Sequence, residues 1–181
     1  MVEIVNKILA ICTVVSHVVL IIGFIYYFVV GRKGNDKIIQ FLGKHGLKFA
    51  FFFAFLATIS SLFYSDIAGY VPCVLCWYQR IFMYPLVILF GMAWAKKDSK
   101  ILSYTTVLAS FGLVISVYHN YISLGGTELF SCDNSGVSCL RQYVFEYDYV
   151  TIPSMAFTAF VLVLVFSKLQ KIYDRNTSKQ S

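Results

Sequence analysis

Five long apolar segments constrain this chain more than any other feature of its sequence. They cover residues 8–30, 49–64, 77–95, 101–118 and 150–169. A helix of about 20 apolar residues crosses the hydrocarbon core of a bilayer, and none of the segments alternates as a strand would. The sequence therefore predicts an all-α integral membrane protein with five transmembrane helices.

The composition excludes other classes of protein. Of the 181 residues, 59% are hydrophobic and 13% are charged, whereas soluble domains carry about 25% charged residues. Disordered chains need low hydrophobicity, and five cysteines are too few for a soluble disulfide scaffold. The first segment is longer than the apolar part of a signal peptide and lacks a basic flank before it. We expect it to remain as a transmembrane helix, in which Cys12 and His17 pack or hydrogen-bond between helices.

The distribution of Lys and Arg predicts how the chain is oriented. Twelve of the 15 lie in three segments that a five-helix topology puts on one side, which are residues 31–48, 96–100 and 168–179. The remaining three are Lys7, Arg80 and Arg141. Because basic residues mark the cytoplasmic side, the C-terminus is expected in the cytoplasm of a multi-pass cell-membrane protein. The net charge of +6 then indicates topology and contact with anionic lipid, not nucleic-acid binding.

Four of the five cysteines lie in the segments expected outside the cell. Cys73 and Cys76 precede the third apolar segment, Cys132 and Cys139 lie before the fifth, and Cys12 is within the first. Paired cysteines on the oxidising side of a membrane form disulfides. Two structural disulfides and two redox-active pairs both fit this distribution.

The C-x-x-C spacing of Cys73 and Cys76 favours redox activity. The apolar segment begins directly after Cys76, which puts this cysteine near a helix N-terminus, where free N–H groups and the helix dipole stabilise a thiolate. Arg80 follows four residues later, on the same helical face and about one turn deeper. A cation within a transmembrane helix is a functional candidate. The two cysteines and Arg80 together indicate a redox site at the membrane surface.

Metal binding is the main rival interpretation of a C-x-x-C pair. A tetrahedral site would also need Cys132 and Cys139, whose separation is not a usual one for zinc ligands, and no His or Met lies beside Cys73 or Cys76. We therefore expect no metal. The chain has no haem, iron–sulfur or nucleotide-binding motif. By elimination, the electron acceptor of a membrane dithiol is a quinone in the bilayer.

The second outer segment combines a turn with a helical pattern. Cys132 and Cys139 enclose DNSGVS, which is typical of a turn. After them, four apolar side chains are spaced i, i+3, i+4 and i+7, as in a short helix lying on the membrane surface. They are Leu140, Tyr143, Val144 and Tyr147. An aromatic belt at the interface is the alternative.

Three segments resemble the disulfide-bond formation protein B family (DsbB), in its Gram-positive BdbC form. The first is PCVLCWYQRIFMYPLVILFGMAWA, which contains Cys73, Cys76 and Arg80 and is similar to the quinone-site helix of the family. The others are FSCDNSGVSCLRQY, which contains Cys132 and Cys139, and VTIPSMAFTAFVLVLV. The two cysteine pairs and Arg80 make the resemblance specific.

The resemblance also implies a domain organisation. It covers about residues 48–170 and implies a four-helix transmembrane bundle. Residues 1–47 lie outside it, as an additional N-terminal transmembrane helix and a cytoplasmic loop. Residues 171–181 are expected to form a cytoplasmic tail.

The family resemblance implies a relay of disulfides. Proteins of this family oxidise an extracytoplasmic thiol oxidase of the thioredoxin fold, which is DsbA-like or BdbD-like, and reduce a membrane quinone. By matching position, Cys132 would form the mixed disulfide with the partner, and Cys139 would exchange with Cys73. Cys76 would then react with the quinone, menaquinone or ubiquinone. The resemblance also implies that Arg80 and, less specifically, His119 bind the quinone.

Two alternative functions remain at this point. A quinone reductase similar to vitamin K epoxide reductase would share the four-helix bundle and the C-x-x-C pair. In that family the C-x-x-C pair follows the loop cysteines in the sequence, whereas here it precedes them. The second alternative is a non-enzymatic membrane protein with two structural disulfides.

Overall fold

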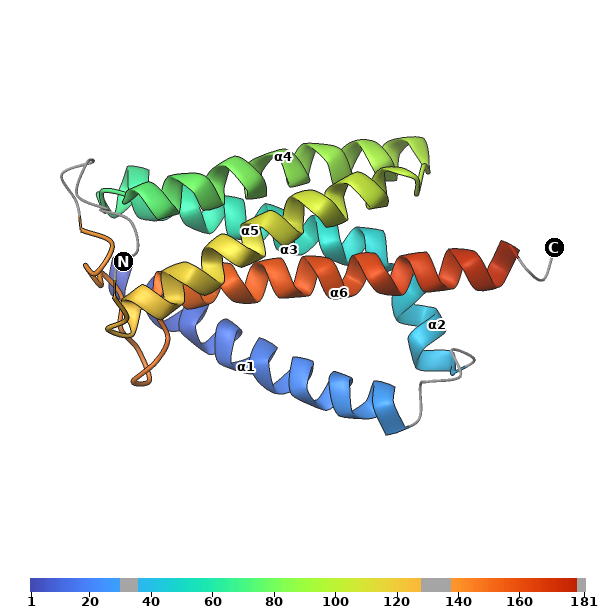
Figure 1. Ribbon diagram of the computed structural model, residues 1–181, viewed down its shortest axis with the longest axis horizontal. Helices are drawn as coiled ribbons and strands as arrows, with labels where there is room; N and C mark the ends of the chain where they lie inside the picture. The colour runs from blue at the N-terminus through green and yellow to red at the C-terminus, as the bar shows by residue number, and fades with distance from the viewer. Residues whose placement is uncertain (30–35, 128–137, 179–181) are drawn as a thin grey trace.

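The computed structural model describes residues 1–29, 36–127 and 138–178, and in these ranges the protein is all-helical apart from one isolated β-bridge (Figure 1). The predicted fold class is therefore confirmed. The helices are α1 (Val2–Val29), α2 (Lys37–Lys44), α3 (Gly46–Leu62) with a short π-helical extension η2 (Phe63–Ile67), α4 (Val74–Lys96), α5 (Ile101–Ser123) and α6 (Ile152–Ser178).

Four of these helices form the central bundle. Helix α3 packs on α4 and α6, and α5 packs on the same two helices from the other side (Figure 1). Helices α4 and α5 approach closely where Phe90 and Leu102 are fully buried. At Gly112 of α5, the ring of Phe160 fills the space that a Cβ atom would occupy. The remaining buried core residues are Ala50, Ala54, Met83, Leu86, Ala109 and Val163.

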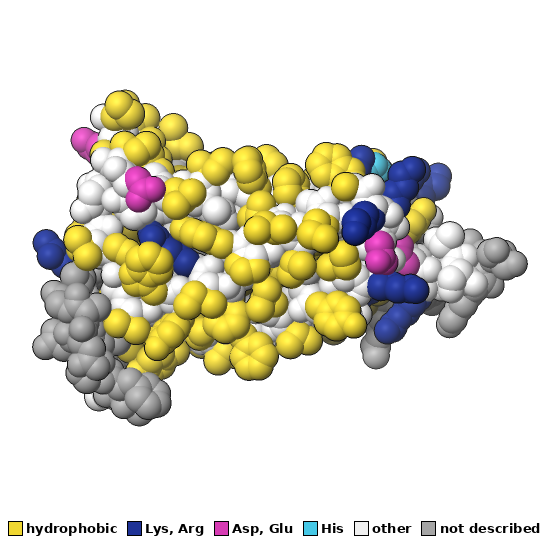
Figure 2. Space-filling view, turned by 90° about the horizontal axis from the view of Figure 1, so that it is seen from above, with side chains coloured by type: hydrophobic (Ala, Val, Ile, Leu, Met, Phe, Trp, Pro, Cys, Tyr) yellow, Lys and Arg dark blue, Asp and Glu magenta, His cyan; other side chains and the backbone are white. Residues whose placement is uncertain are grey.

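The outside of the bundle is apolar along most of its length. Five helices, α1, α3 with η2, α4, α5 and α6, are long and apolar enough to cross a membrane. In Figure 2, hydrophobic side chains cover the middle of the molecule and most Lys and Arg side chains in view gather at one end. An apolar exterior between polar ends is the surface expected in lipid. The chain is a multi-pass membrane protein.

The two ends of the bundle differ in chemistry. At one end, which we call the cysteine end, lie the N-terminus and the start of α4 with Cys73; at the other, the basic end, lie the α4–α5 connection and the C-terminus (Figure 1). Lys96, Lys97 and Lys100 belong to that connection. The separation of the cysteines from most of the basic residues follows the sequence prediction.

Helix α1 lies against the bundle along its first half only. Its buried residues are Asn6, Ala10 and Thr13, and His17 continues the same helical face. Nε2 of His17 lies 2.7 Å from Oγ1 of Thr158 on α6, which confirms the expected interhelical hydrogen bond. Beyond this contact α1 diverges from α6 (Figure 1). Small and polar side chains at helix contacts are typical of membrane proteins.

Two helical segments were not predicted. Residues 37–44, expected within a cytoplasmic loop, form α2, and α6 continues to Ser178 through most of the expected tail. Glycines allow the first of these to pack on α6: a Cβ atom at Gly43 would lie 2.8 Å from Cβ of Tyr173, and one at Gly46 would lie 2.6 Å from the carbonyl oxygen of Phe166.

The predicted surface helix over residues 140–147 is wrong. Residues 138–150 form turns closed by a β-bridge between Glu146 and Val150. Tyr147 and Asp148 have φ angles of 53° and 62°, in the left-handed region that a right-handed helix cannot contain. Tyr143 instead stacks on Tyr70 with ring centroids 4.6 Å apart. The segment is an irregular loop against the cysteine end.

Candidate active site at the cysteine end of the bundle

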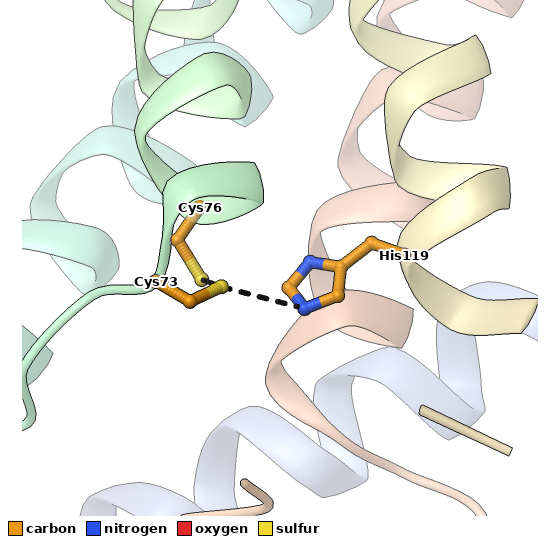
Figure 3. A group of neighbouring side chains, drawn as sticks. All are labelled: Cys73, Cys76 and His119. Atoms are coloured by element: carbon orange, nitrogen blue, oxygen red, sulfur yellow. Dashed lines mark hydrogen bonds between the residues drawn. The ribbon is translucent and has the colours of Figure 1, made fainter. Parts of the chain in front are cut away.

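The C-x-x-C pair forms the first turn of α4. Cys73 is the N-cap residue, with the extended backbone angles φ −72° and ψ 171°. The preceding Pro72 suits this position because proline cannot continue a helix in the N-terminal direction. Cys76 lies three residues later, and its sulfur is 3.2 Å from that of Cys73. The two side chains meet at their sulfurs, which lie side by side (Figure 3), so the sulfurs are placed to form and release a disulfide.

His119 of α5 completes this cluster from the opposite side. Its Nε2 atom lies 3.7 Å from the sulfur of Cys73 (Figure 3), and its Nδ1 atom lies 3.2 Å from the amide nitrogen of Gln79. His119 is 2% exposed and Gln79 is 6% exposed. When the Gln79 amide donates to Nδ1, the imidazole carries its proton on Nε2, which faces Cys73.

Gln79 is a site residue that the sequence interpretation missed. The sequence does indicate this residue, because a polar amide within an apolar segment is unusual. Gln79 also follows Cys76 by three residues, which puts both on the same face of the helix. An uncharged polar side chain inside a transmembrane helix needs a hydrogen-bond partner. Here that partner is His119.

The cluster lowers the pKa of Cys73. The hydrogen bond with the Cys76 thiol is the largest cause, His119 acts in the same direction, and burial opposes both, so that the pKa of Cys73 falls to about 4. The sequence had indicated Cys76 as the thiolate at the helix N-terminus. In the structure, Cys73 occupies the N-cap itself, and this is the sulfur that both neighbours approach.

Arg80 lies deeper in the same region, held by groups that carry no charge. Its guanidinium donates to the carbonyl oxygen of Ser61 on α3 at 3.0 Å and lies 5.3 Å from the centre of the Trp77 ring. Tyr84 reaches the hydroxyl of the same serine at 3.2 Å. Within the described ranges, no carboxylate forms an ion pair with Arg80. Its positive charge is thus available to a polar atom of a ligand.

A cavity of about 510 Å³ joins these residues. Cys73, Cys76, Arg80 and His119 all line it. The sequence had grouped the two cysteines with Arg80, and their role in a redox reaction stays a prediction. Other lining residues come from α1, α3 and α6, among them Thr13, Phe53, Tyr64, Met155 and Phe160. Most of the lining is apolar, with a few polar groups at one end, which is the usual composition of a small-molecule site.

The second cysteine pair is described only in part. Cys139 is buried in a small apolar cluster with Cys73, Leu75 and Ile122, although the two cysteines are far apart in sequence. The loop after it is anchored to α5 through Gln142, whose amide donates to the carbonyl oxygen of Ser123 at 2.7 Å. Cys132 lies outside the described residues.

The remaining predicted residue of the first helix, Cys12, also lines the cavity. Its side chain is exposed on α1, and its neighbour Ser16 donates to its carbonyl oxygen at 2.7 Å. Helix α1 therefore supplies one wall of the cavity.

Comparison with known families identifies the family of the chain. The family model described as disulfide bond formation protein DsbB matches residues 44–170. The chain belongs to the DsbB family. No solved structure matches the chain significantly.

Three of the relatives in the DsbB family come from Bacillus species. The chain is 44% identical over 117 residues to a "Probable disulfide formation protein C" of Bacillus cereus, covering 63% of this chain and 83% of the relative. It is 40% identical over 121 residues to "Disulfide bond formation protein C" of Bacillus subtilis, covering 65% and 86%. The "SPbeta prophage-derived disulfide bond formation protein B" of Bacillus subtilis is 41% identical over 113 residues, covering 62% and 76%.

One argument from the sequence needs correction within this DsbB-type site. The expectation of no metal rested on the absence of a histidine beside the C-x-x-C pair. The fold supplies one from α5, since one ligand atom each of Cys73, Cys76 and His119 lies within 4.8 Å of the other two. A spacing argument along the chain cannot detect a ligand contributed by another helix.

Proposed function

We propose that this protein is a membrane thiol:quinone oxidoreductase that reoxidises an extracytoplasmic, thioredoxin-fold thiol oxidase of the DsbA or BdbD type. It would thereby support disulfide formation in exported proteins. The observation that carries the proposal is the position of Cys73 and Cys76, side by side at the start of α4 and lining an apolar cavity together with Arg80. The membership of the chain in the DsbB family supports the same assignment.

The first part of the proposed relay uses the outer loop. Two electrons and two protons leave the partner's dithiol, which becomes a disulfide, and the Cys132–Cys139 disulfide is reduced through a mixed disulfide at Cys132. The Cys139 thiolate then attacks the sulfur of Cys73 in the Cys73–Cys76 disulfide, and Cys76 leaves as a thiolate. Attack by Cys132 on Cys139 releases Cys73 and restores the loop disulfide. The burial of Cys139 in one cluster with Cys73 supports this exchange.

The residues lining the cavity fit a quinone. A flat, mostly apolar ring with two carbonyl oxygens needs an apolar space and a few hydrogen-bond donors, and the cavity of about 510 Å³ offers both. Arg80 and His119 would hold the oxygens, and Cys76 would lie beside the ring. A bound menaquinone or ubiquinone supplies an acceptor for two electrons and two protons. The apolar walls exclude water and so keep the reduced thiols from other reactions.

The distribution of charge supports an orientation with the cysteine end outside. Lys96, Lys97, Lys100 and the basic residues of α6 lie at the opposite end of the bundle. By the positive-inside rule the basic end faces the cytoplasm. The cysteine end would then face the oxidising compartment, where the partner resides.

The experiment that tests the proposal is a measurement of stoichiometry. Purified protein in detergent is mixed with an excess of a reduced thioredoxin-fold partner, with and without a soluble quinone. We expect sustained, quinone-dependent oxidation by the unmodified chain. A chain with both Cys73→Ser and Cys76→Ser should oxidise about one equivalent of the partner and then stop, because the loop pair has no acceptor.

The same experiment tests the alternative of two structural disulfides. If both disulfides were structural, the double variant would lose stability and no partner would be oxidised by either chain. Sustained quinone-dependent turnover by the double variant would refute the relay. A Ser110→Ala chain is the control, since that hydroxyl is exposed on α5 and bonds within its own helix, and it should keep full turnover.

A further inference from the structure

We propose that the reduced forms of Cys73 and Cys76, together with His119, bind a single Zn²⁺ ion. Bound zinc would hold both thiolates and stop the enzyme in its reduced state. Metal binding stands on the structure alone, whereas inhibition rests on the proposed function. The observation is that two sulfurs and one imidazole nitrogen from two different helices converge on one point (Figure 3).

The distances are close to those of a tetrahedral zinc site. Zn–S bonds of about 2.3 Å and Zn–N bonds of about 2.0–2.1 Å put the ligand atoms of such a site roughly 3.5–3.8 Å apart. The sulfur of Cys73 and Nε2 of His119 are 3.7 Å apart, which already meets this condition. The two sulfurs are 3.2 Å apart and would have to separate by about half an ångström. The third pair of ligand atoms, from Cys76 and His119, lies within 4.8 Å, and a rotation of the Cys76 side chain would have to adjust both of its distances.

Gln79 supplies the support that a zinc-bound histidine needs. A histidine bound through one nitrogen carries a proton on the other and donates it to an acceptor, which fixes the orientation of the ring. The amide of Gln79 lies 3.2 Å from Nδ1 of His119. Turning this amide by half a rotation replaces its NH₂ group with its carbonyl oxygen. Gln79 is 6% exposed, which limits competition from water for its carbonyl oxygen.

The charges also balance in a buried position. Coordination releases the protons that remain on the two thiols, and two thiolates with one Zn²⁺ ion and a neutral imidazole have no net charge. A neutral group is far cheaper to bury than an ion. Two arginines line the same cavity: Arg80 is held by Ser61 and Trp77, and Arg141 lies over the ring of Tyr143. The fourth position of the ion faces the cavity, where water or another small ligand completes the tetrahedron.

The oxidation state of the pair decides whether the ion binds. A disulfide has no thiolate to offer, so only the reduced site binds zinc, and the ion stabilises the reduced state by mass action. Both sulfurs are then occupied and neither can attack a disulfide or give up electrons. Zinc on the outer side of the membrane would thus inhibit the proposed relay.

The binding test uses cobalt as a spectroscopic probe. The full-length protein in detergent is reduced, freed of reductant without oxygen, and titrated with Co²⁺. We expect one Co²⁺ per chain, with a thiolate-to-cobalt absorption band and the visible bands of four-coordinate cobalt, both lost on addition of Zn²⁺. The oxidised protein should show neither band. Equal binding to the oxidised protein would overturn the proposal.

Variants locate the ion. The Cys132→Ser/Cys139→Ser chain is the matched control and should keep the full signal, whereas Cys73→Ser should abolish the thiolate band. His119→Ala and Gln79→Leu should each weaken binding about tenfold or more. His119→Gln gives a second test at the same position if the alanine variant does not purify. Retention of the band in Cys73→Ser, loss of it in the loop variant, or unchanged affinity without His119 would each contradict the site.

Inhibition is measured separately. Quinone-dependent oxidation of the partner is followed with a chelator and with added Zn²⁺. We expect turnover with the chelator and its loss with zinc, at the concentration that displaces cobalt. Absence of turnover with the chelator would contradict the proposed function and leave the cobalt result intact. Undiminished turnover at saturating zinc would contradict the proposed inhibition by zinc.

Discussion

His17 of α1 and Thr158 of α6 are joined by a hydrogen bond of 2.7 Å where these two helices pack together. The ring of His17 also stacks on Tyr149, with centroids 5.9 Å apart. Thr158 donates its one hydroxyl proton to the carbonyl oxygen of Ser154 at 2.8 Å, so its oxygen accepts from Nε2–H of His17. This is the contact that holds α1 beside the cavity.

Removal of this contact should weaken the attachment of α1. We expect Thr158→Val to lower the stability of the detergent-solubilised protein by about 1 kcal/mol, the usual size of an interhelical hydrogen bond in a membrane. Stability is measured from unfolding in a denaturing detergent. Ser110→Ala on α5 is the control, because that hydroxyl is exposed and bonds within its own helix. Equal losses in the two variants would show that His17 contributes nothing.

Arg80→Ala should impair the use of quinone more than the reaction with the partner. The guanidinium lines the cavity and has no carboxylate partner in the described part of the chain, and a hydrogen bond to a charged group contributes about 1.5–3 kcal/mol. We expect the KM for a soluble quinone to rise about tenfold or more. The assay is steady-state partner oxidation at several quinone concentrations.

The control for this variant is Arg175→Ala, which removes an arginine at the basic end of α6. It should leave the KM for quinone unchanged. If Arg80→Ala slowed formation of the mixed disulfide with the partner and left the KM for quinone unaltered, the assigned role would be wrong.

Enlargement of Gly112 should destabilise the bundle. A Cβ atom at this position would collide with the ring of Phe160, and insertion of a methyl group into a tightly packed core costs about 1–3 kcal/mol. Gly23→Ala makes the same chemical change where no atom lies within 4 Å, and it should have no such cost. Unfolding midpoints of the two variants check the prediction, and a Gly112→Ala protein as stable as Gly23→Ala would contradict the packing described.

Labelling of single cysteines tests the orientation. In a chain without other cysteines, Leu124→Cys at the cysteine end of α5, where the side chain is 73% exposed, should react with a membrane-impermeant thiol reagent in intact cells. Lys97→Cys at the basic end and Ser181→Cys at the C-terminus should react only after the cells are opened. Labelling of Ser181→Cys in intact cells would reverse the predicted topology.

The sequence predicted the helices better than the connections between them. Hydropathy identifies the five long helices because each has to match the bilayer on its own, whatever its neighbours do. Residues 140–147 have a helical spacing of apolar side chains but are not helical, since Tyr147 and Asp148 adopt left-handed angles. Stacking of Tyr143 on Tyr70 is a tertiary contact that outweighs a short local pattern.

Only part of the candidate site could be predicted from the sequence. Cys73, Cys76 and Arg80 could be grouped from sequence because one helix carries them. The contact of His119 with Cys73 at 3.7 Å depends on how α4 and α5 cross, which the order of residues does not reveal. The small and polar face of α1, Asn6, Ala10 and Thr13, was readable as a helix contact from its spacing, whereas its position beside the cavity was not.

The position of Cys73 directly before α4 determines how reducing equivalents would enter the membrane. Cys73 is the residue directly before α4, and Cys76 lies in the first turn of this helix, which is long and apolar enough to cross a membrane. In the proposed relay, two cysteines three residues apart would therefore connect the aqueous side of the membrane with the lipid. Reducing equivalents from a water-soluble protein would reach a molecule that dissolves only in the bilayer, and neither reactant would have to leave its own phase.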